Sequence, residues 1–188
     1  MPLLLASVDF SFSQSFSAEN KITCNSLDIT DDKRYIAYAT YLHEFYVYSN
    51  YGGDMFTIHQ KIINRDAKGI ISVDLTADGE WLVASDLNGI LFTYQRMNKK
   101  YELFQVLPEN KKEKLLGGRI SDDKWIVGFF KEKAQIYYFN GSKFVFQESF
   151  TILKGEINNV EISRDHQFLV IGSNHQEFLI FKYNGSTF

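Results

Sequence analysis

Apolar and polar residues alternate in short runs along most of this chain, and each run stops at a turn signal. In the stretch 73–83, Val73 and Leu75 are predicted to point to one side of a strand while the polar residues between them point to the other. Such alternation, interrupted by Asp-Gly or Asp-Lys, is typical of strand–turn–strand structure. No stretch keeps a helical period, and we expect 107–116 to be a loop. The sequence therefore predicts an all-β protein.

This strand–turn–strand pattern occurs four times along the chain. The turn aspartates lie at intervals of 46, 45 and 42 residues: Asp32, Asp78, Asp123 and Asp165. An aromatic residue follows each turn: Tyr35, Trp81, Trp125 and Phe168. A second aromatic closes each third strand, at intervals of 46, 45 and 44 residues: Tyr48, Tyr94, Phe139 and Tyr183. Three landmarks that keep nearly one period indicate an internal repeat.

Each repeat supplies three or four antiparallel strands, and a unit of that size cannot bury both of its faces alone. Four-stranded sheets that stack around a central axis form a β-propeller. We therefore expect a single β-propeller domain over 1–188, made of four blades. The strands of these blades are predicted at about 25–62, 71–107, 116–150 and 158–188.

The fourth repeat reaches Phe188 where its last strand should begin. The segment 8–17 contains DFSFSQSF, which is similar to KFVFQESF at 143–150, the last strand of the third repeat. We therefore expect the N-terminal strand to complete the last blade. One alternative stays open, in which the chain is half of a larger, eight-bladed ring shared by two copies and this strand completes the neighbour's blade.

Composition and charge narrow the function classes. The chain has 17 Phe and 11 Tyr, which favours strands. Its net charge of −3 gives no basic excess for nucleic acid. Cys24 is the only cysteine, and no apolar run is long enough for a signal peptide or a membrane span. These features predict a soluble, intracellular (cytoplasmic) protein that binds neither nucleic acid nor membrane.

Residues 72–95, SVDLTADGEWLVASDLNGILFTYQ, resemble a WD-repeat blade across its first three strands. The matching positions are Thr76, Asp78, Gly79, Leu82, Ala84, Ser85, Gly89 and Leu91. The likeness repeats more weakly in the other three segments. The namesake Trp-Asp pair is replaced by Tyr48-Ser49, Tyr94-Gln95, Phe139-Asn140 and Tyr183-Asn184, and no Gly-His pair opens a repeat. The resemblance implies a divergent WD-like propeller that binds other proteins.

The residues give little sign of catalysis. The four histidines stand at no metal-ligand spacing and in no hydrolase motif: His43, His59, His166 and His175. Turn chemistry accounts for the repeated aspartates, and there is no glycine-rich phosphate loop. We therefore expect no enzyme activity, no cofactor and no metal, and we interpret the protein as a scaffold or as a structural subunit of a larger complex.

In a scaffold, the recognition residues are expected on the loops between the second and third strands. The candidate protein-binding residues there are Tyr41, His43, Phe129, Phe130, Lys131 and His175. Phe129 and Phe130 could instead end a buried strand. The partner is another protein, and the chain itself is expected as a monomer or a ring-sharing homodimer.

The alternative function is a small-ligand or cation site, or an enzyme, that uses the central channel. Four residues occupy equivalent positions on the innermost strands: Asp28, Asp74, Arg119 and Glu161. They could bind a cation, or they could face the neighbouring blades.

Overall fold

The computed structural model describes residues 23–53, 55–108, 115–152, 155–175 and 178–188. Within these ranges the chain forms fifteen strands in four antiparallel sheets and no helix. It therefore contains no helix long and apolar enough to cross a membrane in the described ranges. The segment 8–17, predicted to complete the last blade, lies outside the described residues.

Each sheet is a meander of consecutive strands, called here a blade. Blade 1 contains β1 (Cys24–Ile29), β2 (Tyr35–Thr40), β3 (Glu44–Ser49) and β4 (Thr57–Ile63). Blade 2 contains β5 (Ile70–Leu75), β6 (Trp81–Asp86), β7 (Leu91–Met97) and β8 (Lys100–Leu107). Blade 3 contains β9 (Gly117–Ile120), β10 (Trp125–Phe130), β11 (Lys133–Phe139) and β12 (Phe144–Thr151). Blade 4 contains β13 (Ile157–Ile162), β14 (Phe168–Ser173) and β15 (Phe178–Lys182).

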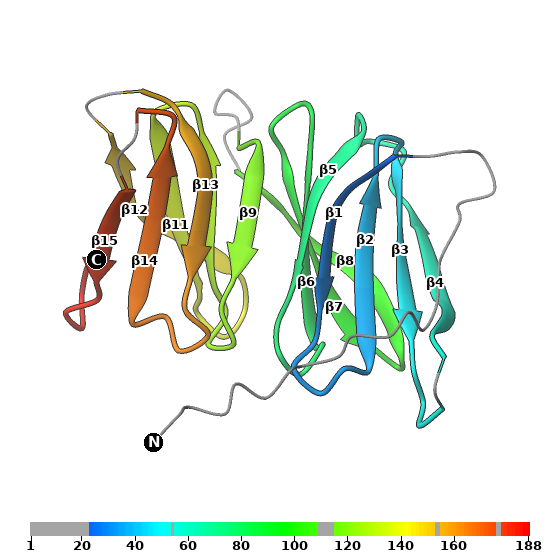
Figure 1. Cartoon of the computed structure of the whole chain (residues 1–188). Helices are drawn as coiled ribbons and strands as arrows, with labels where there is room; N and C mark the ends of the chain where they lie inside the picture. The colour runs from blue at the N-terminus through cyan, green and yellow to red at the C-terminus, as the bar shows by residue number, and fades with distance from the viewer. Residues whose placement is uncertain (1–22, 54, 109–114, 153–154, 176–177) are drawn as a thin grey trace, which may run out of the picture.

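The four sheets are arranged around one axis as a four-bladed β-propeller, which confirms the predicted fold class. The first strands of successive blades, β1, β5, β9 and β13, contact one another in turn. In Figure 1, β9 and β5 lie between β13 on one side and β1 on the other. The first strand of each blade is therefore the innermost strand.

The turn after each first strand is held by short side chains. In blade 2, the Thr76 hydroxyl donates to the Asp78 carboxylate (2.6 Å) and accepts from the Trp81 N–H (3.0 Å). Gly79 takes a φ of 65°, in the left-handed region that favours glycine. The same hydroxyl–carboxylate pair recurs as Thr30 with Asp32 and as Ser163 with Asp165. Local hydrogen bonding thus explains why the aspartates recur.

In blades 3 and 4, the aromatic residue that the sequence pattern assigned to the third strand is wrong by two positions. In blades 1 and 2, Tyr48 pairs with Ile36 and Tyr94 pairs with Leu82. Ile36 and Leu82 each come one residue after the aromatic that follows the turn. By the same register, the equivalent residues in the last two blades are Tyr137 and Phe181, not Phe139 and Tyr183. Side chains two positions apart share a face of a strand, so a shift of two residues leaves the alternation unchanged.

The hydrophobic core is divided among the interfaces between neighbouring blades. One cluster joins blades 1 and 2, the second joins blades 2 and 3 around Trp81, and the third joins blades 3 and 4. Among the described residues, no such cluster joins blade 4 to blade 1. Each blade therefore stabilises the next by burying apolar surface, as expected for a repeat architecture.

Candidate binding surface

One end of the propeller carries the loops between second and third strands together with the connections between blades. Main-chain hydrogen bonds tie the two sets together, for example Ile70 N–H to the Leu42 carbonyl (2.8 Å) and Asn174 N–H to the Glu156 carbonyl (3.0 Å). We call this end the loop face and define it by residues 41–43, 67–70, 87–90, 115–117, 131–132, 155–157 and 174–175. Its loops are held by the blades beneath them and form a preorganised surface.

The loop of blade 1 presents two large side chains to solvent. The Thr40 hydroxyl donates to the Glu44 carbonyl (2.6 Å) and closes the loop. Tyr41 is 54% exposed and Leu42 is 42% exposed. His43 is also exposed, and its carbonyl accepts from the Asn64 N–H (2.8 Å). Sequence reasoning chose Tyr41 and His43 but missed Leu42, whose place at the tip of a short loop was the available signal.

The loop of blade 2 was not singled out from the sequence. The Asp86 side chain is fully buried, and its carboxylate accepts from the N–H groups of Lys68 (2.8 Å), Asn88 (3.0 Å) and Ile90 (3.0 Å). This arrangement fixes the loop and leaves Leu87 38% exposed at its tip. An Asp followed three residues later by Gly was the turn signal that could have indicated a rigid loop here.

The three candidate residues of blade 3 occupy different environments. Phe129 packs on the core cluster between blades 3 and 4, where its ring lies over Gly117. Phe130 is half-buried, and the Lys131 ammonium lies 5.6 Å from the centre of its ring. Lys131 is exposed at the turn. Phe129 therefore matches the interpretation as the end of a buried strand, whereas Phe130 and Lys131 are available to a partner.

His175 lies at the tip of the blade 4 loop and is exposed, packed beside Gly155. It shares the loop face with His43, but the two histidines belong to blades 4 and 1. In the described part of the chain, no group of three or more His, Cys, Asp or Glu side chains is placed to hold a metal ion.

The channel residues connect neighbouring blades. The Asp28 carboxylate accepts from the Leu75 N–H (2.7 Å) of blade 2, and the Asp74 carboxylate accepts from the Ile120 N–H (2.7 Å) of blade 3. Burial, and then the nearby negative charge of Asp28, raises the pKa of Asp74 to about 7. In blade 3 the equivalent residue is Arg119, which forms an ion pair with Glu161 of blade 4 (3.1 Å).

The opposite end of the propeller carries the turns after the first strands. Arg164 of blade 4 donates to the Leu75 carbonyl of blade 2 (2.6 Å), and it lies 3.4 Å from the Asp31 carboxylate of blade 1. The Asp122 N–H of blade 3 donates to the Arg164 carbonyl (2.9 Å). Arg164 of blade 4 thus contacts each of the other three blades at this end.

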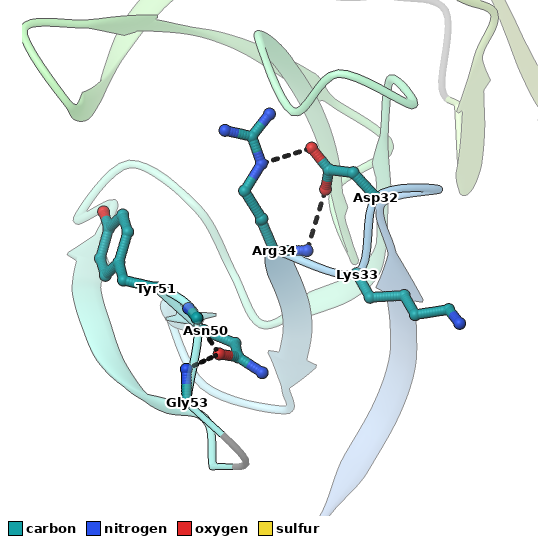
Figure 2. A pocket seen from close by; sticks show the side chains of 7 residues that line it. Asp32, Lys33, Arg34, Asn50, Tyr51 and Gly53 are labelled. Carbon is teal, nitrogen blue, oxygen red and sulfur yellow. Dashed lines mark hydrogen bonds and ion pairs between the residues drawn. The ribbon is translucent and has the colours of Figure 1, made fainter.

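A shallow pocket lies at this opposite end of blade 1 (Figure 2). It is lined by Asp32, Lys33, Arg34, Asn50, Tyr51, Gly52 and Gly53. The Arg34 guanidinium and main-chain N–H both bind the Asp32 carboxylate, and the Asn50 side chain accepts from the Gly53 N–H (2.9 Å). These polar groups therefore bind one another within their own turns.

Known proteins share the fold of this chain. No protein-family model matches it, and no curated protein matches it. A solved structure of a putative 6-phosphogluconolactonase from Bacteroides uniformis superposes with a TM-score of 0.70 and 13% identity, over 94% of this chain and 56% of that chain. The β-propeller domain of Cps50 (Swd1) from Myceliophteria thermophila superposes with a TM-score of 0.69 and 13% identity, over 87% of this chain and 55% of that chain.

The chain has a β-propeller fold. It spans just over half the length of each of these two proteins. At 13% identity the likeness extends to the fold, which many unrelated functions share.

Proposed function

We propose that the protein is a non-catalytic scaffold, or structural subunit of a larger complex, that binds another protein through the loop face. The observation that supports this proposal is the exposure of Tyr41, Leu42 and Leu87 on loops fixed by buried hydrogen bonds. Large apolar side chains exposed on a rigid surface gain free energy when a partner covers them. Because the loops are already ordered, little conformational entropy is lost on binding.

The chemistry of the loop face also suits protein recognition. Aromatic and basic residues are frequent anchors of protein interfaces, and here Tyr41 lies on the same face as the Phe130–Lys131 pair. The channel offers a contrasting environment, since Asp28, Asp74 and Arg119 already bind the neighbouring blade. A ligand in the channel would have to replace these bonds, whereas a partner at the loop face would not.

The test begins by finding the partner through the proposed surface. A photo-crosslinking amino acid replaces Tyr41 in one variant and Tyr51 in another, since Tyr51 is 65% exposed at the opposite end. We expect a crosslinked protein that is specific to the Tyr41 variant. That protein is then purified, and its Kd for the wild-type chain is measured by calorimetry.

Alanine variants then locate the binding energy. The triple variant Tyr41→Ala, Phe130→Ala, Lys131→Ala should bind the partner at least about tenfold more weakly, because loss of an interface anchor costs more than about 1 kcal/mol. The matched control, Arg34→Ala with Tyr51→Ala, removes a cation and an aromatic from the opposite end and should leave the Kd unchanged. Equal affinity of the triple variant and the wild type would overturn the proposal.

The enzyme alternative has a direct test of its own. One of the matched structures bears the name of a putative 6-phosphogluconolactonase. We expect this protein to hydrolyse a phosphorylated sugar lactone no faster than the uncatalysed rate. A rate that rises in proportion to protein concentration, and that falls in an Arg119→Ala variant, would indicate a catalytic site in the channel and contradict the proposal.

A further inference from the structure

The interfaces between blades are built from repeated positions. We call the side of a blade that meets the following blade its trailing face, and the side that meets the preceding blade its leading face. The trailing face uses two positions of the third strand, which are completely buried at all three internal interfaces: Phe45 and Val47, Leu91 and Thr93, and Ala134 and Ile136. The leading face uses the apolar positions of the first strand, which are at most 8% exposed: Val73 and Leu75, Ile120, and Val160 and Ile162.

Blade 1 and blade 4 each have one face with no neighbouring blade among the described residues, and the same positions are exposed on these two faces. On the trailing face of blade 4, Phe178 is 68% exposed and Ile180 is 61% exposed. On the leading face of blade 1, Leu27 is 66% exposed and Ile29 is 41% exposed. The side chains on both of these faces are apolar and of the same types as those that the internal interfaces bury. Each face therefore has the composition of one half of a blade–blade interface.

The polar contacts of the internal interfaces also have counterparts at the ends. The carboxylates of Asp28 and Asp74 each accept a main-chain N–H from the first strand of the following blade. In blade 4 the equivalent carboxylate belongs to Glu161, whose side chain is 59% exposed. In blade 1 the equivalent main-chain N–H belongs to Ile29. A blade 4 that met a blade 1 would thus bring a carboxylate to a main-chain N–H, as at the first two internal interfaces.

The curvature of the four blades matches part of a larger propeller. One superposition, with a TM-score of 0.69, places 87% of this chain on 55% of a longer β-propeller domain. The four blades therefore follow part of the arc of that propeller. Propellers of eight blades lie within the known range, and two copies of this chain supply eight blades.

We propose that two copies of this chain join end to end and form an eight-bladed ring. The trailing face of blade 4 in each copy packs on the leading face of blade 1 in the other copy. The ring has twofold symmetry and contains two identical junctions, so the assembly closes rather than growing into a filament. This inference does not rest on the loop face and survives if the proposed function fails.

The experiment measures the mass of the purified full chain in solution by light scattering coupled to size exclusion, at micromolar concentration. We expect a mass of twice 21.8 kDa. Leu27→Glu and Ile180→Glu each place a charge in both junctions and should give a monomer. The control Leu103→Glu changes a side chain that is 52% exposed on the outer strand of blade 2, and it should leave the dimer intact. Circular dichroism verifies that all variants are folded.

Mixing the two monomeric variants sharpens the test. In a mixed ring, the unaltered blade 4 of the Leu27→Glu copy meets the unaltered blade 1 of the Ile180→Glu copy, so one junction is wild type. We therefore expect the mixture to form a heterodimer although neither variant dimerises alone. A symmetric dimer that used the Leu27 face alone would not be restored by mixing.

Three outcomes would overturn the inference. A wild-type mass of one chain would mean that the ends are covered within the chain or by a different protein. A dimer that survives both charge variants would use another surface, such as a strand exchanged between copies. Loss of the dimer in both variants without recovery on mixing would exclude the end-to-end ring.

Discussion

Blade 2 and blade 4 share a strand order and a turn, but they differ in how many of their faces are covered. All six residues of β6 in blade 2 are buried, whereas only Leu169 and Ile171 are buried in β14 of blade 4. Blade 2 lies between two blades, while the described residues place a neighbour on only one face of blade 4. Burial of a strand in this fold therefore depends on its neighbours as much as on its sequence.

The sequences of β6 and β14 are similar, although β6 is buried on both faces and β14 on only one. WLVASD in β6 and FLVIGS in β14 both begin with four apolar residues. A continuous apolar run is typical of a strand that is buried on both faces, and alternation is typical of a strand with one solvated face. The β14 sequence is thus suited to a blade with two neighbours, as expected if a second copy covers blade 4.

The largest expected effect comes from the aromatic residue after the turn. Trp81 is 2% exposed and packs edge-on against Phe104 and Phe144, so Trp81→Ala should lower the free energy of unfolding by about 3–5 kcal/mol. The equivalent Phe168 is 44% exposed, and Phe168→Ala in a monomeric Ile180→Glu background should cost less than about 1 kcal/mol. Urea unfolding followed by circular dichroism measures both. An equal loss of stability in Trp81→Ala and Phe168→Ala would show that other residues of the same chain bury Phe168 in the monomer.

A smaller effect is expected from the buried channel carboxyl. Because the pKa of Asp74 is raised from 3.8 to about 7, the folded protein retains a proton that the unfolded chain loses, and stability should fall as pH rises from about 4 to about 8. Asp74→Asn keeps an oxygen that can accept the Ile120 N–H. We expect it to flatten this slope and to raise the free energy of unfolding at pH 8 by at most about 4 kcal/mol, given about 1.4 kcal/mol for each pKa unit.

The control for that experiment is Glu102→Gln, which removes one exposed negative charge from the same blade. Thermal unfolding is recorded across the pH range for the wild type and both variants. A wild-type stability that rises between pH 4 and pH 8, with no change in Asp74→Asn, would contradict the assignment of a protonated carboxyl at this interface.

Hydrogen bonds at the outer rim of the interface between blades 2 and 3 should contribute less to the free energy of unfolding than the two buried residues above. The Gln105 side chain donates to the Phe144 carbonyl (3.0 Å) and accepts from the Phe144 N–H (2.8 Å). Gln105→Ala should cost about 1–2 kcal/mol, because two partly buried main-chain groups lose their partner. Gln147→Ala removes one exposed bond to the Ser186 carbonyl and should cost less than about 0.5 kcal/mol in the same urea titration. A larger loss of stability in Gln147→Ala than in Gln105→Ala would mean that the interface between blades 3 and 4 is the stronger one.

The smallest effect is expected at the pocket of Figure 2. The Arg34 side chain is 55% exposed in its ion pair with Asp32, so Arg34→Ala should change the free energy of unfolding by less than about 0.5 kcal/mol. Arg96→Ala is the comparison, since the Arg96 side chain is only 16% exposed and its guanidinium also binds the Gly79 carbonyl and the Tyr35 hydroxyl of blade 1. Urea titrations should show a clear loss for Arg96→Ala alone.

The candidate surface was only partly predictable. Tyr41 and Lys131 are exposed on the loop face because short polar loops between strands have no core to enter. Phe129 was assigned to the same surface but packs over Gly117, which is twelve residues away along the chain and in the neighbouring strand. Leu42 and Leu87 were missed, although each lies at the tip of a short loop and is partly exposed there. That these residues bind a partner stays a prediction.

The sequence by itself determined the strands, the turns and the four repeats, because alternation and Thr-x-Asp or Ser-x-Asp hydrogen bonding act within a few residues. The tertiary structure alone decided which aromatic residues are equivalent in the third strands, since a shift of two residues preserves the pattern. It alone decided that Asp28 and Asp74 bridge blades, because their partners lie 46 or 47 residues away. It also decided that Leu27 and Ile180 are exposed while their equivalents are buried, because burial requires a neighbouring blade, and no local pattern shows whether that blade is there.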